Sequence, residues 1–200
     1  MLNNARVRGL IAGVVEPPAR GLLKLGLSPD AVTITGMVGG SVAVLVCFPT
    51  GHLVLGVVLF AVFTCADVLD GTMARISGRS GPWGNFLDAT CDRVSDGAIF
   101  AGLALYGMGA NQPWTVGGAL AALVAGQVVS YAKARAEAVG ATANVGIAER
   151  AERNIVALLA ALLTGLSVPY VLPIAMWGLA AVSVVTVIQR VHHVHRQLRA

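Results

Sequence analysis

Apolar residues fill most of the chain in six long runs, which short polar or glycine-containing segments separate. A helix needs about 20 apolar residues to cross the hydrocarbon core of a bilayer. Runs of suitable length occur at 31–49, 53–74, 85–108, 113–134, 153–168 and 171–190. The pattern therefore predicts an all-α integral membrane protein with six transmembrane helices.

The segment before the first run has a different character. Residues 14–25 mix apolar positions with Arg20 and Lys24, and the Pro17-Pro18 pair is expected to break the helical pattern. An amphipathic segment of this kind lies in the plane of the membrane surface. We therefore divide the chain into a juxtamembrane segment, 1–30, with an N-terminal amphipathic surface helix, and a six-helix transmembrane domain, 31–200. Residues 1–8 show no sign of a secretory signal.

Composition supports a membrane protein. The chain is 56% hydrophobic and 12% charged, with a mean hydropathy of +0.75, whereas about a quarter of residues are charged in soluble proteins. Cys47, Cys65 and Cys91 lie in apolar runs and are odd in number, so no disulfide framework is expected.

Charged residues assign the loops between these runs to two sides. All 14 Lys and Arg residues lie in the N-terminal segment, at 75–93, at 133–153 or after 189. The 10 acidic residues map to the same side, which leaves His52 as the side chain with a potential charge on the other. Because cytoplasmic loops carry an excess of Lys and Arg, we expect both termini and the polar chemistry at the cytoplasmic face of the cell membrane.

Four carboxylates interrupt the second and third runs: Asp67, Asp70, Asp88 and Asp92. A charge inside a membrane costs free energy unless it meets a cation or water, so such acids indicate a functional site. With a rise of about 1.5 Å per residue, both pairs lie at a similar depth, roughly 7–8 Å inside the ends of adjacent helices. Small residues share their helix faces and leave room for a ligand, namely Gly71, Ala74 and Gly84.

Converging carboxylates with few cations beside them indicate a divalent metal, and oxygen ligands favour magnesium or manganese. Two such ions could polarise a pyrophosphate and orient an attacking oxygen, while a spare carboxylate could accept its proton. Two other interpretations remain: the acids pair helices, or they line the cation or proton pathway of a transporter. Their location near one surface, and the lack of a convincing internal repeat, argue against a transporter.

The order Asp67-x2-Asp70-Gly71-x2-Ala74-Arg75-x8-Gly84-x3-Asp88-x3-Asp92 resembles the signature of the CDP-alcohol phosphotransferases at all eight fixed positions. These integral membrane enzymes transfer a substituted phosphate from a CDP-linked lipid to an alcohol and release CMP. The resemblance implies that the four aspartates hold two metal ions, that Asp92 is the general base, and that the protein is a homodimer. From the residues alone, Asp92 could be only a metal ligand.

The resemblance also implies a site for the CDP-lipid, made of residues at the start of the first span, at the end of the second, and in the turn that follows. These residues are Asp30, Ala31, Val32, Thr33, Gly71, Ala74, Arg75, Ser80 and Gly81. An ordinary helix start would explain Asp30 after Pro29, and turn chemistry alone would explain Ser80 and Gly81.

Basic residues at the ends of the last three spans suit an acceptor alcohol that itself carries a phosphate, because Arg binds phosphate bidentately. A general attraction to anionic lipid would explain the same residues. The segments 87–97, 130–137 and 149–153 are similar to those of the actinobacterial phosphatidylinositol phosphate synthases of this family. That resemblance implies 1D-myo-inositol 3-phosphate as acceptor, with its phosphate bound by Lys133, Arg135, Arg153 and Arg190. A phosphatidylglycerophosphate synthase is the alternative.

Two features stay outside this scheme. Asp96 continues the four-residue spacing of Asp88 and Asp92, and its role is open. The histidines at 192, 193 and 195 lie in an amphipathic tail where solvated side chains are expected, not a zinc site. The expected partners are CDP-diacylglycerol, inositol phosphate and membrane lipids, and not nucleic acid.

Overall fold

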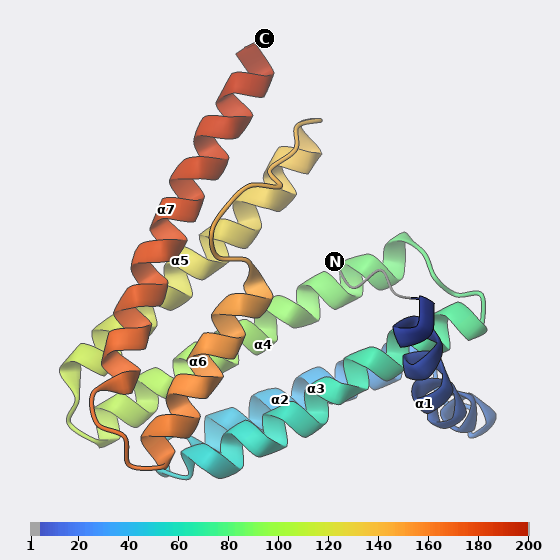
Figure 1. Cartoon of the computed structure of the whole chain (residues 1–200), viewed down its shortest axis with the longest axis horizontal. Coiled ribbons are helices and arrows are strands. Elements are labelled where there is room, and N and C mark those ends of the chain that lie inside the picture. The colour runs from blue at the N-terminus through green and yellow to red at the C-terminus, as the bar shows by residue number, and fades with distance from the viewer. Residues whose placement is uncertain (1–4, 200) are drawn as a thin grey trace. The chain divides into compact units, whose positions relative to one another are not determined.

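The computed structural model describes the backbone of residues 5–199 and the side chains of residues 15–65 and 68–199. This part of the chain contains helices and no strand (Figure 1). The helices are α1 (Ala5–Lys24), α2 (Pro29–Cys47), α3 (Leu53–Ile76), α4 (Pro82–Gly109), α5 (Pro113–Ala138), α6 (Arg150–Gly165) and α7 (Val171–Arg199). The all-helical class is confirmed, and each of the helices α2 to α7 overlaps one of the predicted apolar runs.

Within the described residues, four helices are long and apolar enough to cross a membrane: α2, α3, α5 and α7. The charged residues of α4 lie at 88, 92, 93 and 96, and α6 has only 16 residues. These two helices therefore lack a long uncharged stretch. Several apolar helices of this length support a membrane protein.

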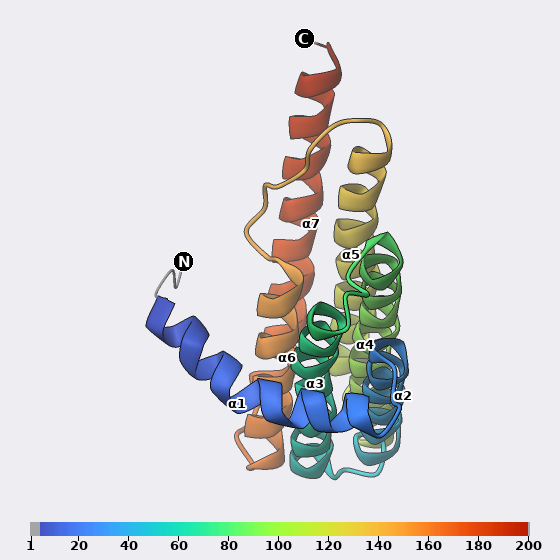
Figure 2. The ribbon, with the colours of Figure 1, turned by 90° about the vertical axis from the view of Figure 1, so that its right-hand side faces the viewer.

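The predicted break at Pro17-Pro18 is wrong, because α1 continues through both prolines to Lys24. Figure 2 shows the α1 ribbon bending about midway along its length. A proline removes one helical hydrogen bond and its ring clashes with the preceding turn, which can bend a helix without ending it. On the exposed side of α1, Arg20 pairs with Glu16 one turn earlier at 3.3 Å.

A residue in the left-handed conformation follows each helix from α1 to α6 within four positions of its end: Gly26, Gly51, Gly78, Asn111, Gly140 and Ser167. At the end of α3, the Gly78 N–H donates to the Arg75 carbonyl at 3.4 Å, and the Arg79 N–H donates to the Ala74 carbonyl at 2.9 Å. This pair of bonds is the Schellman motif, and Gly78 takes its φ of +68° without a steric cost. The turn from α3 to α4 is therefore short and well defined.

The chain forms two compact units. The first comprises the described part of Met1–Ala43 together with Val58–Ser95, and the second comprises Val44–Val57 and the described part of Asp96–Ala200. In the second unit α5 and α7 pack along each other (Figures 1 and 2). A Cβ on Gly118 of α5 would lie 2.9 Å from the Met176 Cβ, so glycine permits this close approach.

Candidate active site

A cavity of about 390 Å³ lies in the first unit, between the start of α2, the end of α3, the turn that follows α3, and the start of α4. Most of the residues predicted for the metal and CDP-lipid sites line this cavity. They are Asp30, Thr33, Asp70, Gly71, Ala74, Ser80, Gly81 and Asp88. The structure therefore brings the start of α2 together with a segment that lies about 40 positions later in the sequence, from the end of α3 to the start of α4.

Some predicted residues do not line the cavity. The Ala31 N–H donates to the Ser28 hydroxyl at 3.2 Å, and the Arg75 guanidinium donates to the Thr72 hydroxyl at 2.9 Å. Val32 and Asp92 are both partly buried outside the cavity lining. The side chain of Asp67 lies outside the described residues.

The sequence interpretation missed two polar residues that line the cavity, Arg79 and Asn85. Arg79 directly follows the left-handed Gly78, and Asn85 lies in the first turn of α4. A cation next to Ser80 and Gly81 was a usable signal, because a site for pyrophosphate needs positive charge. The cavity thus contains an Arg that the family signature does not include.

Three residues explain why α2 begins where it does. The Ser28 hydroxyl accepts a hydrogen bond from the third residue of α2, Pro29 occupies the first helical position, and Asp30 lies in the first turn. Each of these is favourable at a helix N-terminus, where free N–H groups give a partial positive charge. The helix start predicted around Asp30 is therefore confirmed.

Asp30 also contacts α4 directly. The Trp83 indole Nε1–H donates to the Asp30 Oδ2 at 2.9 Å. The Trp83 ring is 61% exposed and lies 5.9 Å from the Phe86 ring, centroid to centroid. This bond holds the first turns of α2 and α4 together at the edge of the cavity.

Asp70 is buried and receives a hydrogen bond from Thr33 of α2. The Thr33 hydroxyl also lies 3.1 Å from the Pro29 carbonyl, and with a single proton it donates to one of the two at a time. A hydroxyl donor helps to orient a carboxylate, so Thr33 contributes to the orientation of Asp70.

The groups lining the cavity suit a hard divalent cation. Asp70 and Asp88 supply carboxylate oxygens, and at Gly71 and Gly84 an added Cβ would meet no heavy atom within 4 Å. Oxygen donors beside open space match the preference of magnesium and manganese. Among the residues whose side chains are described, no three His, Cys, Asp or Glu side chains form a group that could hold a metal. The convergence of four aspartates therefore stays a prediction.

Two of the four cations predicted to bind the acceptor phosphate are almost fully buried in the second unit. Arg153 is 2% exposed, and its Nη1 and Nη2 donate to the carbonyls of Ala148 at 3.1 Å and Gly126 at 3.3 Å. Arg190 is 4% exposed, and its Nε and Nη1 donate to the carbonyls of Val145 at 3.0 Å and Val129 at 2.6 Å.

The other two predicted cations are more accessible, since Lys133 is partly buried and Arg135 is exposed. Arg135 and Arg190 line one groove of about 430 Å³ between α5 and α7, together with Tyr131 and His195. Lys133 and Arg153 do not line this groove. This groove therefore brings together one pair of the four.

Asp96, whose role the sequence left open, is a buried ion-pair residue. Its Oδ1 accepts from the Arg150 Nε at 3.0 Å and from the Asn154 Nδ2 at 2.7 Å. Arg150 and Asn154 lie one turn apart at the start of α6, so Asp96 ties α4 to this end of α6. The i, i+4 spacing of Arg150 and Asn154 was the one available signal, but it does not identify the partner helix.

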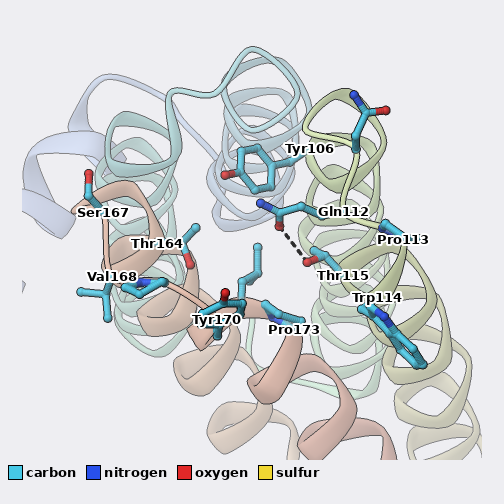
Figure 3. Close-up of a pocket in the computed structure, with 13 residues that line it drawn as sticks. Tyr106, Gln112, Pro113, Trp114, Thr115, Thr164, Ser167, Val168, Tyr170 and Pro173 are labelled. Carbon is cyan, nitrogen blue, oxygen red and sulfur yellow. Dashed lines mark hydrogen bonds between the residues drawn. The ribbon is translucent and has the colours of Figure 1, made fainter.

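A second cavity, of about 480 Å³, lies in the second unit between the turn from α4 to α5 and the turn from α6 to α7. Figure 3 shows Tyr106, Gln112 and Tyr170 around it, with Gln112 accepting a hydrogen bond from Thr115. Its lining holds aromatic, hydroxyl and amide groups without a charged side chain. The cavity therefore does not suit metal or phosphate chemistry.

Comparison with known proteins adds independent evidence. A family model described as CDP-alcohol phosphatidyltransferase matches residues 27–189. The chain is 47% identical over 183 residues to the phosphatidylinositol phosphate synthase of Mycolicibacterium smegmatis, covering 90% of this chain and 82% of that relative. It is 43% identical over 202 residues to the phosphatidylinositol phosphate synthase of Streptomyces avermitilis, covering 97% and 83%.

Solved structures show the same similarity. The crystal structure of Mycobacterium tuberculosis phosphatidylinositol phosphate synthase with CDP-DAG bound matches this fold with a TM-score of 0.86 at 43% identity, covering 92% of this chain and 94% of that one. A second structure of that synthase, in complex with manganese and citrate, gives a TM-score of 0.85 at 44% identity and covers 89% and 87%.

Proposed function

Because the chain belongs to the CDP-alcohol phosphatidyltransferase family, we propose that it transfers the phosphatidyl group from CDP-diacylglycerol to 1D-myo-inositol 3-phosphate and releases CMP. This makes it a phosphatidylinositol phosphate synthase. The similarity to synthases of that name over nine-tenths of the chain carries the proposal. A relative of the same fold that binds CDP-DAG supports the donor substrate.

Asp67, Asp70, Asp88 and Asp92 would hold two magnesium ions, and manganese would serve as well. The open space beside Gly71 and Gly84 supports this assignment, as does the manganese in a solved relative. When bound, the ions supply charge neutralisation for the pyrophosphate and for the departing CMP. Thr33 would keep Asp70 oriented as a ligand, because it donates to this carboxylate.

The CDP-lipid would occupy the cavity in the first unit. Asp30, Ala31, Val32 and Thr33 at the start of α2, with Gly71, Ala74 and Arg75 of α3, would surround the nucleotide, and Ser80 and Gly81 would lie over the pyrophosphate. Arg79 lines the same cavity and would add positive charge beside the leaving group.

The transfer of the phosphatidyl group would proceed by direct displacement at phosphorus. Asp92 accepts the proton of the acceptor hydroxyl, and the hydroxyl oxygen forms a bond to the phosphorus attached to diacylglycerol. The bond from this phosphorus to the CMP oxygen breaks, and the bonding electrons leave with CMP. This scheme uses no covalent intermediate on the protein.

Lys133, Arg135, Arg153 and Arg190 would bind the acceptor phosphate. Arg190 supports this role, because its hydrogen bonds go to main-chain carbonyls, which are polar but uncharged. A guanidinium held in this way keeps a formal charge that an anionic ligand can meet. The same chemistry suits glycerol 3-phosphate, so the test below compares the two acceptors.

In the membrane, α2 to α7 would make six crossings with both termini and the active site at the cytoplasmic face, and α1 would lie on the surface. The placement of basic residues supports this topology. CDP-diacylglycerol would then enter from the cytoplasmic leaflet with its acyl chains remaining in lipid. The family resemblance supports a homodimer.

The test is CMP release by the purified protein with CDP-diacylglycerol and magnesium. Inositol phosphate, glycerol 3-phosphate, free inositol and serine are compared as acceptors, with EDTA as the control. We expect release with inositol phosphate and none with EDTA. Release only with glycerol 3-phosphate would keep the family reaction and replace the acceptor, and no release with any acceptor would contradict the proposed function.

A further inference from the structure

The loop between α5 and α6, residues 139–149, runs along α7 and is fixed to it at three points (Figures 1 and 2). The Gln197 side chain accepts from the Thr142 N–H at 3.0 Å and donates to the Thr142 carbonyl at 2.7 Å. Arg190 donates to the Val145 carbonyl, and Thr186 holds the end of the loop. These three residues of α7 fall within about 40° of one another around the helix, so one face of α7 carries the loop.

Thr186 is the most buried of these contacts, with no exposed surface. Its hydroxyl oxygen accepts from the N–H groups of Ile147 and Ala148, both at 3.3 Å, and its proton is donated to the Val182 carbonyl at 2.9 Å. The loop approaches Thr186 so closely that a Cβ on Gly146 would lie 2.4 Å from the Thr186 Cγ2. The Thr186 hydroxyl therefore binds two consecutive residues of the loop, and its methyl group lies against a third, Gly146.

The same stretch of the loop orients both buried arginines. The Ala148 carbonyl accepts from Arg153, and the Val145 carbonyl accepts from Arg190. Each guanidinium also donates a hydrogen bond to a main-chain carbonyl of α5. Arg153 donates to the Gly126 carbonyl, and Arg190 donates to the Val129 carbonyl. Because a guanidinium is planar and its donors are rigidly spaced, two fixed carbonyls determine where its remaining N–H groups point. A shift of residues 145–148 would rotate both arginines.

We propose that Thr186 is a positioning residue for the acceptor phosphate, which acts on Arg153 and Arg190 through the α5–α6 loop and does not itself touch the substrate. The inference rests on the proposed function, since it assumes that these arginines bind a phosphorylated acceptor. Its distinctive consequence is that loss of the Thr186 hydroxyl raises the KM for the acceptor and leaves the KM for CDP-diacylglycerol unchanged.

The test compares Thr186→Val, Thr186→Ser and Ser183→Ala with the wild-type protein in full kinetics, with inositol phosphate and glycerol 3-phosphate as acceptors. In Thr186→Val the side chain keeps its shape and loses the hydroxyl. We expect the KM for the acceptor to rise about tenfold, which corresponds to the loss of one or two net hydrogen bonds. Serine keeps the hydroxyl and should restore the wild-type value. Ser183 is the matched control, because its buried hydroxyl, one turn away on α7, has no hydrogen-bond partner in the described part of the chain.

A second variant covers the case in which Thr186→Val does not fold. Gly146→Ala pushes the loop away from an intact Thr186 and should also raise the acceptor KM, whereas Gly178→Ala, where an added Cβ meets nothing within 4 Å, should not. A parallel rise in the KM values of both substrates would overturn the inference. An acceptor KM that stays unchanged in both Thr186→Val and Gly146→Ala would also overturn it. If the wild-type protein turned over neither acceptor, this result would instead overturn the proposed function, on which the inference rests.

Discussion

The ion pair between Asp96 and Arg150 should stabilise the packing of α4 against α6 much more than an exposed pair stabilises a single helix. The Asp96 side chain is 6% exposed and that of Arg150 is 32% exposed, and the atoms lie 3.0 Å apart. Removing one partner of a fully buried pair costs about 3–5 kcal/mol, whereas exposed pairs contribute about 0–1 kcal/mol. Since Arg150 is one-third exposed, we expect a coupling energy of about 2 kcal/mol, below the fully buried range.

A double-mutant cycle measures this coupling. Asp96→Ala, Arg150→Ala and the double variant are compared with the wild type for their free energies of unfolding in detergent micelles. The chain offers its own control in the pair of Glu16 and Arg20, whose side chains are 42% and 61% exposed and 3.3 Å apart. The control cycle should give less than about 0.5 kcal/mol. Equal coupling in the two cycles would refute the assignment of a structural role to the buried pair.

Three further variants test the site. Asp92→Asn should keep the protein folded and able to bind CDP-diacylglycerol but abolish turnover, because an amide cannot accept the proton; substantial residual CMP release would rule out the general-base role. Thr33→Val removes the hydroxyl that donates to Asp70 and should raise the magnesium concentration for half-maximal activity about tenfold, with an unchanged metal titration contradicting the role of Thr33. Arg153→Gln should raise the KM for inositol phosphate at least about tenfold at constant KM for CDP-diacylglycerol, and an unchanged value would place the acceptor phosphate elsewhere.

Hydropathy predicted where the helices lie, but not where they end. The sixth apolar run stops at residue 190, yet α7 continues to Arg199, and α5 continues to Ala138 beyond the predicted end at 134. Hydropathy identifies only the apolar stretch of a helix, whereas the helical hydrogen bonds continue into the polar residues beyond it. The ends are set by turn residues such as Gly140, which takes the left-handed conformation two positions after the last residue of α5.

Local spacing predicted much of the cavity, because most of its residues come from α3, α4 and the turn between them. Asp70, Gly71, Ser80 and Asp88 are all within 20 residues of one another, so helical geometry alone places them near one end of a helix pair. The contribution of Thr33 depends on α2, and only the family resemblance pointed to that segment.

Long-range pairings could not be predicted from spacing. Asp96 and Arg150 are separated by 54 positions, and nothing in either local sequence identifies the other. The positive charges at 153 and 190 were visible in the sequence, but their burial was not. Their acceptors are main-chain carbonyls, which every residue carries, so no sequence pattern could reveal that the α5–α6 loop orients both arginines.

The most direct test of the central claim is a competition for the acceptor, with the lipid product identified by mass spectrometry. The purified protein is given CDP-diacylglycerol and magnesium with equal concentrations of inositol phosphate and glycerol 3-phosphate. We expect phosphatidylinositol phosphate as the dominant lipid product, formed in a one-to-one ratio with CMP. Phosphatidylglycerophosphate as the dominant product would contradict the proposed acceptor.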